Sequence, residues 1–202
     1  MIETIKALDA TLFYWVNTEM SNPVFDAMLP WFREKWFWAP LYLFIVAFCI
    51  QQFKNRGILI VLGLVLAVGL SDFTSNTLIK KNVKRLRPCN DPVMVERVNT
   101  RVPCGSGYSF TSNHAANHFA VAVFLMTVFG YISPWIKRVG YAWAVAVAFS
   151  QVYVGVHYPF DVFFGALLGG LIGGIVFLLY QKSILVINNR WVFKIDDGRP
   201  DG

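Results

Sequence analysis

The sequence predicts an all-α fold, a polytopic membrane bundle of about five transmembrane helices preceded by an N-terminal interfacial helix. Of the 202 residues, 56% are hydrophobic and only 15% are charged, which lies outside the usual balance of a water-soluble domain. Several stretches also approach the roughly 20 apolar residues that a helix needs to cross a hydrocarbon core. They are residues 36–53, 57–78, 112–133, 139–156 and 160–181. We therefore expect one integral membrane domain over residues 1–202.

The two ends of the chain are predicted to lie outside the bilayer core. Residues 1–35 lack the basic start and long apolar centre of a cleavable signal. Apolar residues recur there at helical spacing, which favours a helix lying along the membrane interface. They are Ile2, Ile5, Leu8, Leu12, Phe13 and Val16. Residues 183–202 are expected to form a short cytoplasmic tail.

The charge of the chain points to a lipid partner. The formal net charge is +6, and much of the basic charge falls within residues 80–101, beside two predicted spans. A basic cluster at that place suits an anionic lipid head group or phosphate better than nucleic acid. We expect a membrane lipid phosphate and the bilayer as partners, and no nucleic acid. The sequence carries no signal of oligomeric state.

The order of the spans brings three polar segments to one membrane face. Because successive spans run antiparallel, the ends of the second and fourth lie beside the starts of the third and fifth. Residues 80–87, 112–118 and 157–161 therefore meet. The short loops on the opposite side carry Lys54 and Arg56, then Lys137 and Arg138, so the positive-inside tendency makes that side cytoplasmic.

The predicted extracytoplasmic loop, residues 80–108, is equally basic, but cations with a functional partner are a poor guide to insertion. This loop contains Cys89 and Cys104, whereas Cys49 lies within a span. A cysteine pair in an exposed loop favours a disulfide in an oxidising compartment, which stabilises by about 3 kcal/mol for a loop of this length. Two unrelated free thiols are the alternative. A disulfide would place the polar face in the periplasm or outside the cell.

The first polar segment combines Lys80 with Arg87-Pro88. Cations beside a span often only anchor it at the head groups. Here, however, Asp72, Asn76 and Lys80 recur every four residues and form a polar stripe, and such groups normally face a bundle interior. Arg87 offers a planar fork suited to phosphate oxygens, and Lys80 offers a point charge.

The second segment is Ser112-Asn113-His114, just before the third span. These residues suit a helix cap, and a helix N-terminus also aims unpaired N–H groups at an anion. His114 in the first turn is placed to exchange a proton with a bound group. His118 follows one turn later. With no glutamate or cysteine nearby, we interpret it as a hydrogen-bonded bundle histidine rather than a metal ligand.

The third segment runs from Ser150 to Asp161. Pro159 suits a first helical turn, so His157 precedes the fifth helix and Asp161 lies inside its first turn. Asp161 could simply favour the positive helix end. It also begins an i+4 stripe with Gly165, Gly169 and Gly173, and small residues at this spacing let spans pack closely. Asp161 therefore points into the bundle, where a carboxylate needs a partner, and His157 is the nearest candidate.

Together these groups suit phosphoryl transfer. One imidazole would attack phosphorus while the other protonates the leaving oxygen. Lysine, arginine and helix N–H groups would stabilise the charge of the transition state.

These residues resemble the motifs of the type-2 phosphatidic acid phosphatase superfamily, whose fold and site are shared with bacterial acid phosphatases and vanadium haloperoxidases. The first motif is Lys, six residues, then Arg-Pro, and Lys80 with Arg87-Pro88 match it completely. The second, Pro-Ser-Gly-His, appears as Thr111-Ser112-Asn113-His114. The third is Ser-Arg, five residues, His, three residues, Asp. It appears as Ser150-Gln151, then His157 and Asp161. The resemblance covers residues 57–181.

The resemblance implies metal-independent hydrolysis of a lipid phosphate or diphosphate, with no cofactor. His157 would be the nucleophile that forms a phosphohistidine, Asp161 would orient it, and His114 would be the general acid. The expected phosphate-binding groups are Lys80, Arg87, Ser112, Asn113 through its backbone, and Gln151. An undecaprenyl diphosphate, a phosphatidylglycerol phosphate or a lipid A type glycolipid would each fit. The expected location is the inner membrane of a bacterium, with the site facing the periplasm or exterior.

The sequence departs from the motifs at Thr111, Asn113 and Gln151, and the last two departures leave other functions open. Gln151 is uncharged, so the pocket lacks one cation of the family, which Lys84, Arg85 or Arg101 are candidates to replace. Asn113 stands where the family has a flexible glycine. A catalytically weakened lipid-binding relative would tolerate both changes. A membrane transporter that uses Asp72, Asn76 and His118, and a zinc hydrolase built on the three histidines and Asp161, are the remaining alternatives.

Overall fold

The computed structural model describes residues 2–196, and all regular structure in that part of the chain is helical. The all-α prediction is confirmed. In chain order the elements are α1 (Ile2–Tyr14), a π-helical turn (Trp15–Glu19), α2 (Pro23–Arg33), α3 (Lys35–Phe73), a second π-helical turn (Thr74–Ile79), α4 (Lys80–Val83), short 3-10 turns at Pro88–Asn90 and Val95–Arg97, α5 (Asn113–Phe129), α6 (Pro134–Tyr153) and α7 (Pro159–Asp196).

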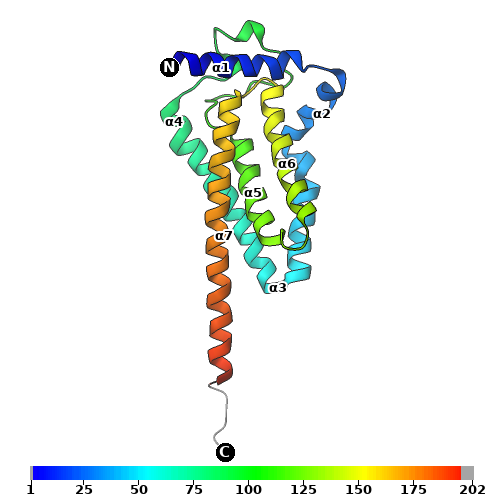
Figure 1. Cartoon of the computed structure of the whole chain (residues 1–202), viewed down its shortest axis with the longest axis vertical. Coiled ribbons are helices and arrows are strands. Elements are labelled where there is room, and N and C mark those ends of the chain that lie inside the picture. The colour runs from blue at the N-terminus through cyan, green and yellow to red at the C-terminus, as the bar shows by residue number, and fades with distance from the viewer. Residues whose placement is uncertain (1, 197–202) are drawn as a thin grey trace, which may run out of the picture.

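Helix α3 is a helical hairpin whose two arms correspond to the first two predicted spans. The chain reverses at Lys54, where φ is 48° and ψ is −120°, values outside the helical region. The arms descend and return in Figure 1. Gly57 allows this reversal, because a Cβ at that position would clash with the backbone carbonyl of Cys49. The second arm leads through the π-helical turn into α4.

Two helical stretches among the described residues are long and apolar enough to cross a membrane, Lys35–Val83 and Pro159–Ile187. Helices α5 and α6 run beside them (Figure 1). Their predicted bounds were wrong by a few residues. Helix α6 begins at Pro134 rather than 139, because Ser133 accepts a hydrogen bond from the Trp135 N–H and proline suits the first position. Helix α5 accordingly ends at Phe129.

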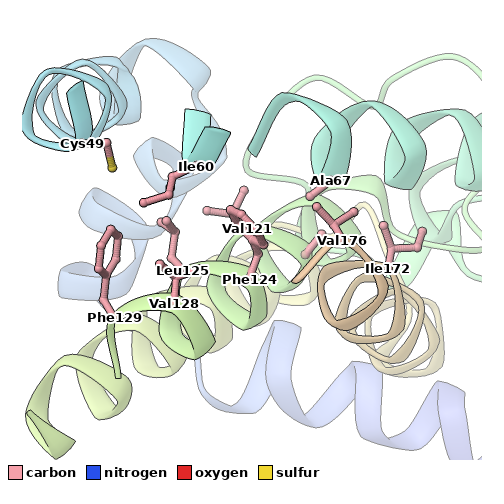
Figure 2. Packing of buried hydrophobic residues seen from close by; sticks show 11 residues of the cluster. Cys49, Ile60, Ala67, Val121, Phe124, Leu125, Val128, Phe129, Ile172 and Val176 are labelled. Carbon is pink, nitrogen blue, oxygen red and sulfur yellow. The ribbon is translucent and has the colours of Figure 1, made fainter. Parts of the chain in front are cut away.

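A hydrophobic core lies between α3, α5 and α7, with α5 at its centre. Figure 2 shows side chains from the three helices gathered in this space. Helix α5 contributes Val121, Phe124, Leu125 and Val128, which are all buried. The outer faces of the bundle are also rich in exposed leucine, phenylalanine and valine. Exposed apolar side chains are unfavourable in water, so a bundle with this exterior suits a lipid environment.

The predicted glycine stripe on α7 packs directly on the backbone of α5. Side chains at Gly165, Gly169 and Gly173 would clash with the backbone carbonyls of Ser112, Ala116 and Ala120, respectively. The glycines of α7 and the carbonyls that they face on α5 both recur every four residues, so the two helices stay in close contact over successive turns. This contact fixes the N-terminus of α7 beside the N-terminus of α5.

The two ends of the chain differ from expectation. Helix α1 lies crosswise over one end of the bundle (Figure 1). Residues 23–33, by contrast, do not continue α1. Asn22 caps a new helix, α2, which runs beside α6. Phe25 of α2 packs edge-on against Tyr153, with ring centroids 5.7 Å apart. The predicted tail begins inside α7, which continues to Asp196, and residues 197–202 lie outside the described part.

The loop between α4 and α5 contains the predicted disulfide. Cys89 and Cys104 are bonded to each other, which confirms that prediction, and Cys49 is a buried free thiol in the α3 hairpin. The bond joins the two ends of residues 89–104, and Arg87 lies two residues before Cys89.

The packing of α5 on α7 predicts opposite effects for two glycine substitutions on the same helix. Gly169→Ala should lower the free energy of unfolding by about 1–3 kcal/mol, because the new methyl group pushes the two helices apart. Gly174 has open space around it, so Gly174→Ala should be neutral or stabilising by up to about 1 kcal/mol. Thermal unfolding in detergent measures both. Equal stability of the two variants would show that the helices do not meet as described.

Candidate active site

Three segments remote in the sequence meet at the end of the bundle beneath α1. They are the end of α4 with the following loop, the N-terminus of α5, and the turn between α6 and α7 (Figure 1). Of the side chains expected to form the site, six are buried there although all six are polar, and Asn113 and His114 are partly buried. The six are Lys80, Arg87, Ser112, Gln151, His157 and Asp161. The predicted convergence on one face is therefore observed.

His157 lies between a cation and a carboxylate. Its Nε2 is 3.2 Å from Arg87 Nη1, and its Nδ1 is 3.6 Å from Asp161 Oδ2. Because a guanidinium only donates, Nε2 accepts this bond and the ring proton sits on Nδ1, towards Asp161. Burial, followed by the charges of Arg87 and Lys80, holds the pKa of His157 well below its usual value of 6.5. The imidazole is thus neutral at neutral pH, with the lone pair of Nε2 directed at the cation.

Asp161 is fully buried and is held by more than His157. Its Oδ1 accepts a hydrogen bond of 2.9 Å from Arg85 Nη1, and its Oδ2 accepts one of 2.8 Å from the Tyr158 N–H. The second bond is the backward half of a capping box, from the third residue of α7 to the residue before the helix. The sequence placed Asp161 correctly in the first turn but named His157 as its partner, whereas Arg85 is closer.

Arg85 links Asp161 to a second buried carboxylate in α1. Its Nη2 is 2.6 Å from Asp9 Oδ2, and its guanidinium stacks 3.8 Å from the centre of the Tyr158 ring. Asp9 Oδ1 also accepts from the Phe160 N–H at 2.9 Å, so it caps α7. Burial raises the pKa of Asp9, and the bonds from Phe160 and Arg85 oppose that rise. Sequence reasoning missed Asp9, whose only signal was one carboxylate on the apolar face of a short helix.

Several donors in the site have no partner within the described residues. Lys80 Nζ donates to the Tyr108 carbonyl at 3.1 Å, and Arg87 Nη1 is 3.2 Å from the Val156 carbonyl. Arg87 Nε and Ser112 Oγ, in contrast, are buried without a hydrogen-bond partner in the part of the chain that the structure describes. Ser112 does not cap α5 with its side chain. Free donors of this kind at a helix N-terminus fit an anion.

Asn113 explains how the loop manages without the glycine of the family motif. Its Nδ2 donates to Asp72 Oδ1 at 2.7 Å, and its Oδ1 accepts from Ser75 Oγ at 2.8 Å. The side chain therefore points to the second arm of α3, away from His157. Only its backbone N–H, unpaired by its position in the first turn, remains for a ligand. Asp72 also accepts from Asn76 at 2.9 Å, so the polar stripe predicted on this arm is partly satisfied by neighbours.

The two histidines of α5 have different surroundings. His118 donates from Nδ1 to the His114 carbonyl at 2.8 Å and accepts from the Tyr42 hydroxyl at Nε2, 3.1 Å away. Both nitrogens are used, which confirms the interpretation of a hydrogen-bonded bundle histidine. His114 Nε2 is 3.2 Å from the Arg33 carbonyl and must donate to it. Among residues 3–187, whose side chains the structure describes, no three His, Cys, Asp or Glu side chains are grouped to hold a metal ion.

The cations suggested to replace the missing arginine are mostly engaged elsewhere. Gln151 itself donates from Nε2 to Val147 and Ser150 of its own helix. Arg85 is bound by Asp9 and Asp161, and Arg101 pairs with Asp26 and stacks on Tyr153. Lys84 is exposed. A cation that the sequence did not single out, Arg33 at the end of α2, lies at the site instead.

The sequence of this chain resembles those of known phosphatases. A sequence model of the PAP2 superfamily matches residues 59–185. The lipid A 4'-phosphatase of Bacteroides thetaiotaomicron is 31% identical over 90% of this chain and 81% of its own length. The undecaprenyl-diphosphatase of Sulfolobus acidocaldarius is 32% identical over 70% of this chain and 62% of its own.

Two solved structures share the fold. Aquifex aeolicus LpxE superimposes with a TM-score of 0.63 and 26% identity, over 84% of this chain and 94% of that one. A transmembrane PAP2 type phosphatidylglycerolphosphate phosphatase from Bacillus subtilis gives a TM-score of 0.68 at 24% identity, over 89% and 87%. The membrane helical bundle is therefore shared with bacterial phosphatases.

The Asp9–Arg85–Asp161 contacts predict a large stability effect at a partly exposed arginine. Arg85→Gln should lower the free energy of unfolding by on the order of 2 kcal/mol, because two buried carboxylates lose their cation. Lys81→Gln, four residues earlier on the exposed face of α4, is the matched control and should change little. Thermal unfolding in detergent measures both. If Arg85→Gln were as stable as Lys81→Gln, Arg85 would not be what holds the carboxylates together.

Proposed function

Because this chain belongs to the PAP2 superfamily and is a lipid phosphate phosphatase of that family, we propose that it removes phosphate from a lipid A type glycolipid through a phosphohistidine on His157. The observation that carries the mechanism is the neutral His157, whose Nε2 faces Arg87 while its Nδ1 faces Asp161. The substrate class is favoured by the similarity to a lipid A 4'-phosphatase over 90% of the chain. A second such phosphatase, from Porphyromonas gingivalis, is 26% identical over 95% of the chain.

In the first step, His157 Nε2 attacks phosphorus and the bond to the lipid oxygen breaks. Lys80, Arg87, Ser112 Oγ and the first N–H groups of α5 hold the phosphoryl oxygens, where negative charge spreads in the transition state. The imidazole becomes positive as the N–P bond forms, and the Asp161 carboxylate stabilises it at Nδ1. His114, which must carry a proton on Nδ1 as well as on Nε2 once the substrate is bound, gives the Nδ1 proton to the departing oxygen and becomes neutral.

In the second step, water attacks the phosphohistidine and the N–P bond breaks. His114, now neutral, accepts the proton of the attacking water, so that phosphate leaves and both histidines return to their first state. The bond from His114 Nε2 to the Arg33 carbonyl fixes the ring. It leaves Nδ1 as the nitrogen that exchanges the proton.

The proposed orientation places the site at the periplasmic surface of a bacterial inner membrane. Both arms of α3 together with α5, α6 and α7 cross the bilayer, and α1 lies along the interface over the site. The disulfide supports an oxidising compartment at this end. A lipid whose tails stay in the bilayer then presents its phosphate at the end of the bundle.

The arrangement favours hydrolysis over transport or passive lipid binding. The ionisable groups of the site gather at one end of the bundle, whereas a transport path needs polar groups along its depth. His157, Asp161 and Arg87 also keep mutual contacts that lipid binding alone does not require.

Substitution of either site histidine tests the chemistry. Purified protein in detergent should release phosphate from a lipid A type substrate at an unchanged rate in EDTA. His157→Ala should lower kcat by about 10⁴-fold or more, because the nucleophile is lost. His114→Ala should lower it by about 10²- to 10⁴-fold, because only the proton transfer is lost. Phosphate release is the measurement, and thermal unfolding confirms that both variants are folded.

A panel that includes undecaprenyl diphosphate and phosphatidylglycerol phosphate separates the substrate from the mechanism. Higher kcat/KM for either of these lipids would reject the lipid A type assignment and leave the chemistry intact. Turnover unaffected by His157→Ala, or abolished by EDTA, would reject the proposed mechanism itself.

A further inference from the structure

Arg33, the last residue of α2, touches the site through both its backbone and its side chain. It lies outside residues 59–185, the part matched to the superfamily. Its carbonyl accepts the hydrogen bond from His114 Nε2. Its guanidinium reaches Gly105, where an added Cβ would lie 3.8 Å from Arg33 Nη2 and 3.9 Å from Arg87 Nη2. Two guanidinium groups are thus placed against the same glycine.

No hydrogen bond or ion pair holds the Arg33 side chain within residues 3–187, whose side chains the structure describes, and its Nη1 is buried there without a partner. The charge of the neighbouring Glu34 favours the cation. Glu34 is adjacent in sequence but is exposed. Burial lowers the pKa of Arg33, although an arginine stays charged in any protein. A half-buried cation whose Nη1 is buried without a partner is unfavourable unless a ligand completes it.

The surrounding charges make the imbalance larger. Burial, followed by the charge of Arg33, lowers the pKa of Arg87. Arg87 Nε and Ser112 Oγ are buried donors without partners as well. Two like charges and several unpartnered donors at one end of the bundle are what a dianionic phosphoryl group requires. Asp161, the nearest buried carboxylate, is already bound to Arg85.

We propose that the Arg33 guanidinium is a phosphate-binding group of this enzyme, supplying from α2 the positive charge that is missing at Gln151. The inference rests on the proposed function and deepens it. Gln151 turns its amide nitrogen into its own helix, so that position offers no donor to the site. The arginine fork enters from the opposite element, beside the general acid, where it binds two phosphoryl oxygens.

The direct test compares Arg33→Gln with Lys35→Gln, a neighbouring exposed cation that stacks on Trp36. In Arg33→Gln, KM for the lipid phosphate and the inhibition constant of inorganic phosphate should both rise by about 10- to 100-fold. Arg33→Lys keeps the charge but loses the fork, so its constants should fall between those of wild type and Arg33→Gln. Lys35→Gln should match the wild type.

A second readout does not depend on turnover. Inorganic phosphate should raise the unfolding temperature of the wild type and of Lys35→Gln by the same amount, because ligand binding stabilises the folded state. The rise should largely disappear in Arg33→Gln. Without phosphate, Arg33→Gln should unfold at the wild-type temperature or above it, because the repulsion on Arg87 is removed.

The outcomes separate this inference from the function on which it rests. The role of Arg33 would be overturned if Arg33→Gln had the wild-type KM and if phosphate raised its unfolding temperature as much as that of the wild type. The dependence on His157 would still stand. A wild type that hydrolyses no lipid phosphate would overturn the function, and the unfolding shift would still decide the binding role.

If Arg33→Gln does not fold, the wild type itself gives the answer. Phenylglyoxal modifies accessible arginines, and mass spectrometry of peptides reports each site. Phosphate should slow modification at Arg33 and leave the exposed Arg138 unaffected. Equal rates at Arg33 with and without phosphate would overturn the proposal.

Discussion

The carboxyl group of Asp161, fully buried at the head of α7, is the constraint on which the rest of this site depends. A carboxyl group in such a place is tolerated only with partners. The Tyr158 N–H and His157 at 3.6 Å are supplied by the adjacent turn, and Arg85 is supplied by the distant loop after α4. Satisfying one charge thus brings together the loop, the turn and, through Asp9, the N-terminal helix. The neutral, correctly oriented imidazole is a consequence of that arrangement.

The sequence was sufficient for those features that depend on local pattern. Apolar length predicted the helices, the i+4 glycine stripe predicted that the last span packs closely against another span, and span alternation predicted that Lys80, His114 and His157 share one face. Features that depend on tertiary contacts were not predictable. The Asp9–Arg85 pair joins residues 76 positions apart, and nothing in either neighbourhood specifies the other. Arg33 was missed for the same reason, since α2 was expected at the interface and the cap at Asn22 directs it along α6.

The departures from the superfamily motifs at Asn113 and Gln151 have separate structural accounts. Asn113 replaces a glycine without filling the site, because its side chain bonds to Asp72 and Ser75 of the α3 hairpin. It thereby joins the N-terminus of α5 to its neighbour. Gln151 lacks the positive charge of the arginine it replaces, and Arg33 from another helix lies beside Gly105, next to Arg87. A positive charge can reach the same site from more than one helix, because only the final position of the charged group matters.

The bond from the Phe160 N–H to Asp9 spans 151 positions and has a consequence for biogenesis. The ribosome releases α1 first, and Asp9 can meet Arg85 once the loop after α4 has emerged, but its Oδ1 acquires the Phe160 donor only after the start of α7 has emerged. A nascent chain therefore carries an incomplete centre until its last membrane helix is delivered, and truncation before that point yields no partial enzyme. Because this contact joins the first and last helices, the site can be completed only late in synthesis.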